Sequence, residues 1–155
     1  VGHRLAGKNL GIIGYGRVGQ QVGEIAKGLG MYVSSVNEEW EENLSSMLRA
    51  SHFITVHIPL QGNIEYFTKE MFRQTNEEAY FINTSRPQIV EPGALRWALA
   101  NKEIAGAASD FIEDDLLTYT GDNLILTNHL GGATTEDMQR TEEFIAKKVR
   151  DAISD

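Results

Sequence analysis

The sequence predicts an α/β fold, a doubly wound parallel sheet of about six strands with helices on both faces. Short apolar segments alternate with helical patterns along the chain, as in proteins built from repeated strand–helix–strand units. These segments lack a polar residue at every second position, which is typical of strands covered on both faces. A glycine-rich turn separates the first strand from the first helix, as such folds require at a ligand-binding turn.

The strands are predicted from six apolar segments that are too short to be helices. In chain order they are residues 10–13, 32–36, 53–56, 79–82, 104–108 and 124–126. Between the first two, apolar residues recur at helical spacing and a glycine supplies a helix stop. This crossover helix carries Val18, Val22, Ile25, Ala26, Leu29 and Gly30.

Two further helices complete the predicted alternation. Pro92 suits the first turn of a helix that continues to Leu99 before the fifth strand. The last helix is expected to start at Thr134 or Thr135, with acidic residues in its first turn and basic residues near its end. Its apolar side is formed by Met138, Ile145, Val149 and Ile153.

Composition narrows the class of protein. The 155 residues are 41% hydrophobic, which suits one domain with a real core, residues 1–155. A net charge of -8 without a basic stripe argues against nucleic acid as a partner. The chain has no cysteine, which excludes disulfides and thiolate metal sites; we expect no metal site. Without a membrane-length apolar segment or signal-like N-terminus, we expect a soluble, cytoplasmic protein.

The segment LGIIGYGRVGQ carries a G-x-G-x-x-G pattern at Gly14, Gly16 and Gly19, directly between a strand and a helix. In this context the first glycine permits a tight turn, the second lets a pyrophosphate approach, and the third lets the helix pack closely on the strand. The N–H groups of Arg17 and Val18 are then candidate phosphate ligands. The glycines predict a Rossmann-type dinucleotide site, although a ligand-free turn or an adenosyl-cofactor site would use the same pattern.

The residue after the second strand bears on the choice of dinucleotide. Dinucleotide sites usually place an acid there to bind the adenosine ribose, whereas this chain has Asn37. Asn37 can still hydrogen-bond a ribose hydroxyl. Glu38 and Glu39 would repel a 2′-phosphate, which favours NAD over NADP.

Several ordered motifs, LAGKNLGIIGYGRVG, HIPL, INTSRP, IAGAASDFIEDD and LTNHLGGAT, together resemble the nucleotide-binding domain of the D-2-hydroxyacid dehydrogenases, the group that contains D-3-phosphoglycerate dehydrogenase. The resemblance covers essentially the whole chain. It implies an NAD-dependent oxidoreductase that exchanges hydride with a 2-hydroxy or 2-keto acid. It also implies that the family's substrate-binding domain is absent from this chain, so the isolated domain is expected to bind NAD but turn over little.

The resemblance implies three catalytic residues. Arg86 matches the arginine that holds the substrate carboxylate, and His129 matches the acid–base that exchanges a proton with the substrate oxygen. Asp115 stands where the family has a glutamate that supports the histidine, so Glu113 or Asp114 remain alternatives. Pro87 replaces a glycine after Arg86, and we expect it to reshape that loop.

The resemblance also implies which residues border the cofactor beyond the glycine turn. Asp110 matches a residue that contacts the nicotinamide carboxamide, and the glycines after His129 match backbone that lines the ring. For His57, contact with the cofactor and structural support are equally plausible. These further cofactor positions are His57, Pro59, Thr84, Ser85, Asp110, Gly131 and Gly132.

Between Asn37 and the following helix the family usually has about ten more residues, including an edge strand. Its loss leaves the predicted strand order 2-1-3-4-5-6. The departures at Pro87 and Asp115 keep a second hypothesis open, an NAD-sensing module without catalysis similar to the C-terminal-binding-protein corepressors. A cofactor-free scaffold is a third. Because family members commonly pair through this domain, we expect a homodimer.

Overall fold

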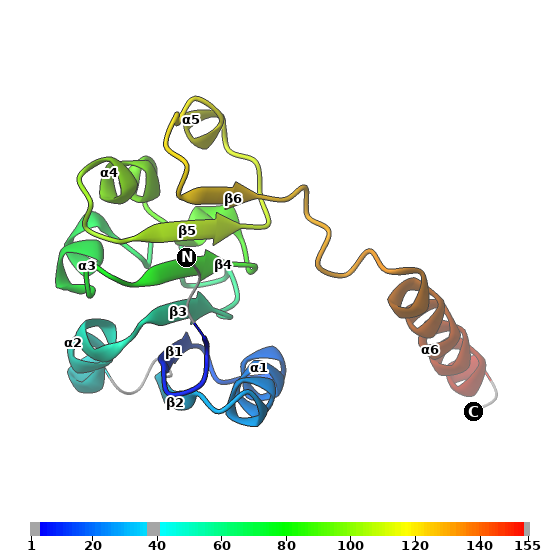
Figure 1. The fold of residues 1–155 in the computed structure, drawn as a ribbon. Helices are drawn as coiled ribbons and strands as arrows, with labels where there is room; N and C mark the ends of the chain where they lie inside the picture. The colour runs from blue at the N-terminus through cyan, green and yellow to red at the C-terminus, as the bar shows by residue number, and fades with distance from the viewer. Residues whose placement is uncertain (1–3, 37–40, 154–155) are drawn as a thin grey trace.

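The chain forms one sheet of six parallel strands in the order β2-β1-β3-β4-β5-β6. The computed structural model describes residues 4–36 and 41–153 (Figure 1). The strands are β1 (Asn9–Ile13), β2 (Tyr32–Val36), β3 (Phe53–Val56), β4 (Tyr80–Asn83), β5 (Gly106–Ser109) and β6 (Leu124–Leu126). Both the number of strands and their order are as predicted, and the predicted boundaries differ from these by two residues at most.

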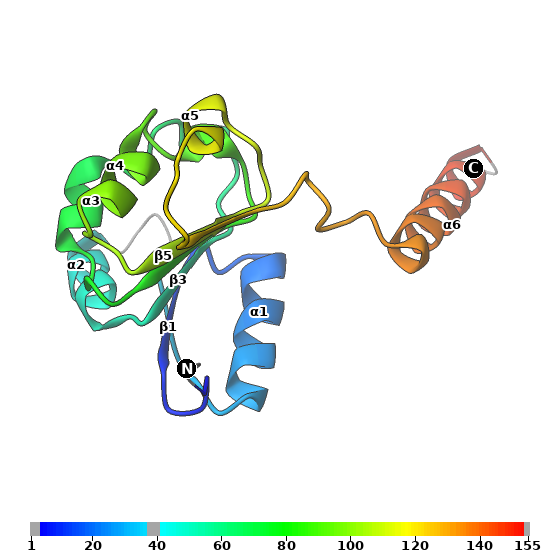
Figure 2. The same cartoon turned by 45° about the horizontal axis from the view of Figure 1, so that its top comes forward.

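The helices lie on both faces of the sheet but cover them unequally. They are α1 (Arg17–Gly28), α2 (Glu41–Ala50), α3 (Lys69–Gln74), the short 3-10 helix η1 (Pro87–Ile89), α4 (Ala94–Ala100), α5 (Asp114–Leu117) and α6 (Thr135–Ile153). Figure 2 shows α2, α3, α4 and α5 on one face, with α1 on the other. The last helix, α6, extends away from the sheet in both views.

The thicker layer holds the main core, between the sheet and helices α2 to α5. Three fully buried rings, Phe67, Phe72 and Phe81, contact one another with centroids 4.6–5.1 Å apart. Aromatic rings in such tilted contacts are among the largest contributors to burial. This core fixes the ends of β3 and β4, from which the loops toward the candidate site leave.

On the opposite face, α1 packs through small residues. Gly19, Gly23 and Ala26 are buried against the sheet, whereas Val18 and Ile25 of the predicted apolar pattern are more than half exposed. The pattern predicts the helix correctly, but close approach to the strand selects the small residues as the contact face.

The apolar side predicted for the last helix is present but uncovered. Met138, Ile145, Val149 and Ile153 are each more than half exposed, and no described residue of α6 is buried. Among the residues that the structure describes, no helix is both long and apolar enough to cross a bilayer.

Candidate functional site

The glycine turn after β1 has the geometry that the sequence motif predicts. Gly14 has φ +90°, a left-handed value, and a Cβ placed on it would lie 2.8 Å from the backbone carbonyl of His57. A Cβ on Gly19 would lie 2.2 Å from the carbonyl oxygen of Gly14. Both positions therefore require glycine, because Gly14 lies against the backbone of His57 and Gly19, in the first turn of α1, lies against the backbone of Gly14.

Gly16 differs, because a Cβ placed on it would meet nothing within 4 Å. It is the N-cap of α1, without a capping side chain and without an acidic residue in the first turn. The first intrahelical bond comes from Gln20 N–H to the Gly16 carbonyl (2.9 Å). The N–H groups of Arg17 and Val18 therefore precede the helical ladder at the positive end of the helix dipole, where a phosphate is stabilised.

A cavity of ≈ 320 Å³ lies beside the ends of β4, β5 and β6. Three predicted cofactor positions, Thr84, Asp110 and Gly131, line it. Its floor includes Ile82, which shares one cross-sheet row with Ile12 through Thr55. Ile12 contacts the α1 glycines, so the cavity opens on the same face of the sheet as α1. The structure thus brings the glycine turn and this cavity onto one face.

The other predicted cofactor positions have mixed surroundings. His57 Nε2 lies 3.0 Å from Thr55 Oγ1, and burial lowers the pKa of His57, which favours its neutral form. His57 also supplies the backbone against which Gly14 packs, and contact of its ring with the cofactor stays a prediction. Pro59 is exposed, and a Cβ on Gly132 would meet nothing within 4 Å. Asn37 and the two glutamates after it lie outside the described residues.

Arg86 is held by the buried Asn83 at the end of β4. Asn83 Nδ2 donates to the Arg86 carbonyl (2.9 Å), and Asn83 Oδ1 accepts from Ser85 N–H (3.0 Å). The Ser85 hydroxyl donates to the Ile58 carbonyl (2.6 Å), and Arg86 Nη1 donates to the Ser85 carbonyl (2.6 Å). Sequence reasoning missed Asn83, whose only signal was a polar residue ending an apolar strand.

The loop accommodates Pro87 without distortion. Arg86 is extended (φ -150°, ψ 143°), and Pro87 is the first residue of η1. Extended backbone is what a residue before proline prefers, and the first position of a helix needs no N–H. The substitution therefore fits the local backbone.

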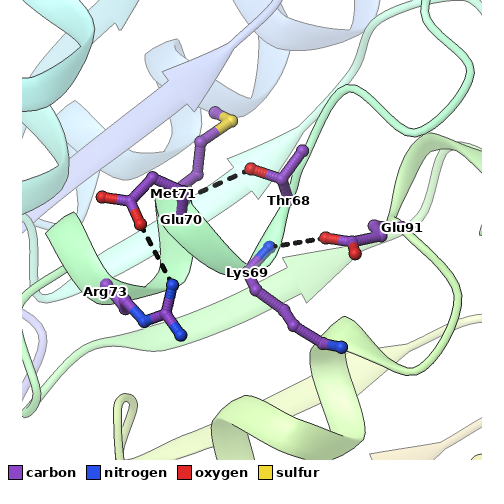
Figure 3. A network of polar contacts seen from close by, with 6 residues as sticks. All are labelled: Thr68, Lys69, Glu70, Met71, Arg73 and Glu91. Atoms are coloured by element: carbon purple, nitrogen blue, oxygen red, sulfur yellow. Dashed lines mark hydrogen bonds and ion pairs between the residues drawn. The ribbon is translucent and has the colours of Figure 1, made fainter.

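The segment beyond Pro87 is tied to the loop before α3. Phe67 N–H donates to the Ile89 carbonyl (2.9 Å), and Glu91 N–H donates to the Phe67 carbonyl (3.0 Å). Figure 3 shows that the Glu91 carboxylate also accepts the N–H of Lys69 (2.8 Å) at the start of α3, which Thr68 caps through Met71 N–H. A carboxylate at a helix N-terminus is favourable, so these bonds anchor the chain on the far side of Arg86.

His129 lies in the loop after β6, three residues beyond Leu126, and adopts a left-handed backbone, φ +54°. Its N–H donates to the Asp110 carbonyl (2.8 Å), and its ring meets the edge of Phe111 at 4.9 Å between centroids. Across residues 4–36 and 41–153, no hydrogen bond or ion pair joins its imidazole to a carboxylate.

Asp110, which directly follows β5, is the buried carboxylate that contacts the loop carrying His129. It accepts hydrogen bonds from Thr127 Oγ1 (2.5 Å), Leu130 N–H (2.9 Å) and Gly131 N–H (2.9 Å). The Thr127 bond first, and then the two backbone bonds, hold the pKa of Asp110 below its usual value. Asp110 is therefore a carboxylate at neutral pH that holds the chain on both sides of His129.

The structure does not bring Asp115 to His129. Asp115 lies on α5 and borders a separate cavity of ≈ 680 Å³, which it shares with Glu113 and Pro87. Its carbonyl accepts from Arg96 Nη1 (2.9 Å) on α4. Burial, and then the charge of Asp115, raise the pKa of Glu113. No group of three His, Asp or Glu in the described part of the chain could hold a metal ion.

Comparison with known proteins bears on this arrangement. The sequence profile of the D-isomer specific 2-hydroxyacid dehydrogenase NAD-binding domain matches residues 1–131. A glyoxylate reductase of Thermococcus litoralis is 34% identical over 96% of this chain and 50% of its own length. The D-3-phosphoglycerate dehydrogenase of Escherichia coli is 34% identical over 92% of this chain and 40% of its own. The chain thus spans about half the length of these relatives.

Solved structures give the same fold. A D-3-phosphoglycerate dehydrogenase-like oxidoreductase from Ralstonia solanacearum superposes with a TM-score of 0.80 at 27% identity, over 88% of this chain and 45% of its own. The D-lactate dehydrogenase of Lactobacillus jensenii, solved with NAD⁺, has a TM-score of 0.79 at 25% identity, over 90% of this chain and 50% of its own.

Proposed function

The chain belongs to the D-isomer specific 2-hydroxyacid dehydrogenase family as its NAD-binding domain, and from this premise we propose that it serves an oxidoreductase that transfers hydride between NAD(H) and a D-2-hydroxy or 2-keto acid. The observation that carries the proposal is the shared face of the sheet. An uncapped helix N-terminus at Gly16 and a cavity beside Asp110 both open on the side of α1.

The described residues fit a dinucleotide at this face. The open space at Gly16 and the N–H groups at the start of α1 suit a pyrophosphate. The cavity lined by Thr84, Asp110 and Gly131 suits the nicotinamide, with Ser85 in the adjoining loop. When bound, the nicotinamide supplies or accepts the hydride.

The chain's own residues would carry the proton and the substrate. Arg86 presents a guanidinium suited to a bidentate contact with the substrate carboxylate. His129 would donate a proton to the keto oxygen during reduction and accept it in the reverse direction. Asp115 would support the imidazolium only after α5 moved, because its carbonyl is held by Arg96. We therefore propose that the domain alone turns over slowly and that a second wall completes the cleft.

A second candidate function rests on that same separation. If Asp115 never reaches His129, the domain would bind NAD without efficient chemistry, similar to the C-terminal-binding-protein corepressors. Its output would then be a change in assembly, such as the homodimer that we expect.

One experiment separates these functions. Calorimetric titration with NADH is combined with NADH oxidation in the presence of a panel of 2-keto acids, for the wild type, for His129→Ala and for the control His52→Asn at the opposite end of the sheet. Turnover that His129→Ala abolishes, with NADH affinity retained, is expected for the oxidoreductase. NADH binding without His129-dependent turnover would favour the sensing module, and an absence of NADH binding would refute both.

A further inference from the structure

We propose that the buried pair Asn83 and Asp110 is a positioning unit that sets Arg86 and His129 relative to each other. Asn83 ends β4 and Asp110 directly follows the neighbouring strand β5, and the Asp110 N–H donates to the Asn83 carbonyl (3.0 Å). Each then holds one candidate catalytic loop through its side chain. The inference rests on the roles proposed above for Arg86 and His129.

Asn83 controls the Arg86 side of this unit. Its side-chain amide donates to the Arg86 carbonyl and its side-chain oxygen accepts from Ser85 N–H. The residue is 1% exposed, so water cannot readily replace either bond, and the loss of a buried partner is costly. The backbone at Arg86 is therefore fixed to the end of β4 rather than free to sample loop conformations.

Asp110 controls the His129 side. Its carboxylate accepts from residues on both sides of the histidine, Thr127 before it and Leu130 and Gly131 after it, while its carbonyl accepts the His129 N–H itself. The residue is 6% exposed. Charge-assisted bonds to a buried carboxylate are about twice as strong as neutral ones.

The Asp110 carboxylate stabilises an unfavourable backbone conformation at His129. A left-handed φ of +54° is unfavourable for a side chain with a Cβ and persists where surrounding bonds determine it. With the loop clamped, the imidazole is kept against the Phe111 ring. A carboxylate can accept about four hydrogen bonds, so three donors from the loop leave room for the cofactor contact that the family resemblance implies.

Asn83 and Asp110 also connect the loops of Arg86 and His129 to the same edge of the sheet. Asn83 and Ser109 are partners in the β4–β5 register, and Thr127 N–H donates to the Ser109 carbonyl (2.9 Å). Three strand ends are thus joined in a row, and the candidate catalytic loops leave from them. Sites built on strand ends keep their geometry better than sites on free loops.

The test is Asp110→Asn in the 155-residue chain. The amide keeps the shape of the carboxylate but presents an NH₂ group to at least one of its three donors. We expect amide hydrogen exchange at Leu130 and Gly131 to accelerate about tenfold or more, and the NMR contacts between the His129 and Phe111 rings to be lost. NADH affinity should change less than His129-dependent kcat, a division that a general loss of stability would not produce.

Two further variants keep the test decisive. Asp137→Asn removes an exposed carboxylate that accepts the Thr134 hydroxyl (2.8 Å), and it should leave all these signals unchanged. If Asp110→Asn fails to fold, Thr127→Val removes one donor and retains the charge, and exchange at Leu130 should still accelerate.

Unchanged exchange and unchanged ring contacts in Asp110→Asn, or in Thr127→Val where that replaces it, would overturn the positioning role. If Asp110→Asn shows the faster exchange but the wild-type chain does not bind NADH, the proposed function alone is refuted.

Discussion

The two ends of the candidate cofactor groove are prepared to different degrees. The glycine turn lies within one strand–turn–helix unit, and Gly14 and Gly19 touch each other directly. The groups proposed for catalysis lie on three separate segments, two loops and the helix α5, each with its own anchor: Asn83 for Arg86, Asp110 for His129 and Arg96 for Asp115. The glycine turn is therefore formed by residues in direct contact. Arg86, His129 and Asp115 are each held by a separate residue.

The two ends differ in the sequence separation of the residues whose contacts form them. The geometry of the glycine turn depends on neighbouring residues of the turn and on His57 and Ile58, which directly follow β3. The segment that carries Asp115 is instead held to α4 by two bonds from Arg96, to the Asp115 carbonyl and to Thr118 Oγ1. The cofactor turn and the segment that carries Asp115 are therefore held by separate contacts, which four substitutions can probe.

The largest expected effect is that of Gly19→Ala, which breaks the glycine turn. Its Cβ would lie 2.2 Å from the Gly14 carbonyl oxygen, a backbone atom that cannot move without opening the turn. Overpacking of this kind costs about 3 kcal/mol or more. Thermal denaturation should show a large loss of stability, together with loss of NADH binding.

Gly16→Ala is the matched control for this substitution. Its Cβ would enter open space, so the melting temperature should stay close to that of the wild type while NADH binds about tenfold more weakly. Equal destabilisation by the two substitutions would contradict this difference, because it would mean that Gly16 is as closely packed as Gly19.

The features that the sequence predicts correctly are those set by local pattern, and the features it misses depend on contacts that the pattern does not specify. Strand order, the glycine contacts and the start of α6 depend on local pattern and on backbone geometry, and they were predictable. The anchor Arg96 was not, because its bonds join α4 to a segment about twenty residues further along the chain. Asn83 was missed although its side-chain bonds are local, because a polar residue that ends an apolar strand does not by itself indicate what it binds. The uncovered side of α6 could not be predicted either, since the apolar pattern requires a partner but does not say where that partner lies.

An intermediate effect is expected for Arg96→Ala, which releases the segment that carries Asp115. Arg96 Nη1 donates to the Asp115 carbonyl in a part-buried bond and to Thr118 Oγ1 (2.5 Å) in an exposed one, and together the two bonds contribute about 1 kcal/mol. Urea denaturation should show that loss, with faster proteolysis within α5. Arg49→Ala, which removes only an exposed bond to Ser45 (2.9 Å), should be nearly neutral; an equal loss in both would mean that Arg96 is not an anchor.

The smallest effect, and the one with a defined pH dependence, is expected for Glu113→Gln beside Asp115. Burial, and then the Asp115 charge, raise the pKa of Glu113 above its usual 4.5. The folded state therefore binds more protons than the unfolded state just above pH 4.5, and stability falls as pH rises through that window.

At pH 7 the ionised Glu113 side chain is disfavoured in the fold, so Glu113→Gln should raise the free energy of unfolding, by less than about 1 kcal/mol at this partly exposed position. The gain should vanish below pH 4.5, where the carboxyl is protonated in both states. Chemical denaturation at pH 4 and pH 7, with Glu142→Gln on exposed α6 as control, measures it. A gain that persists at pH 4 would show that the carboxylate's charge is not the cause.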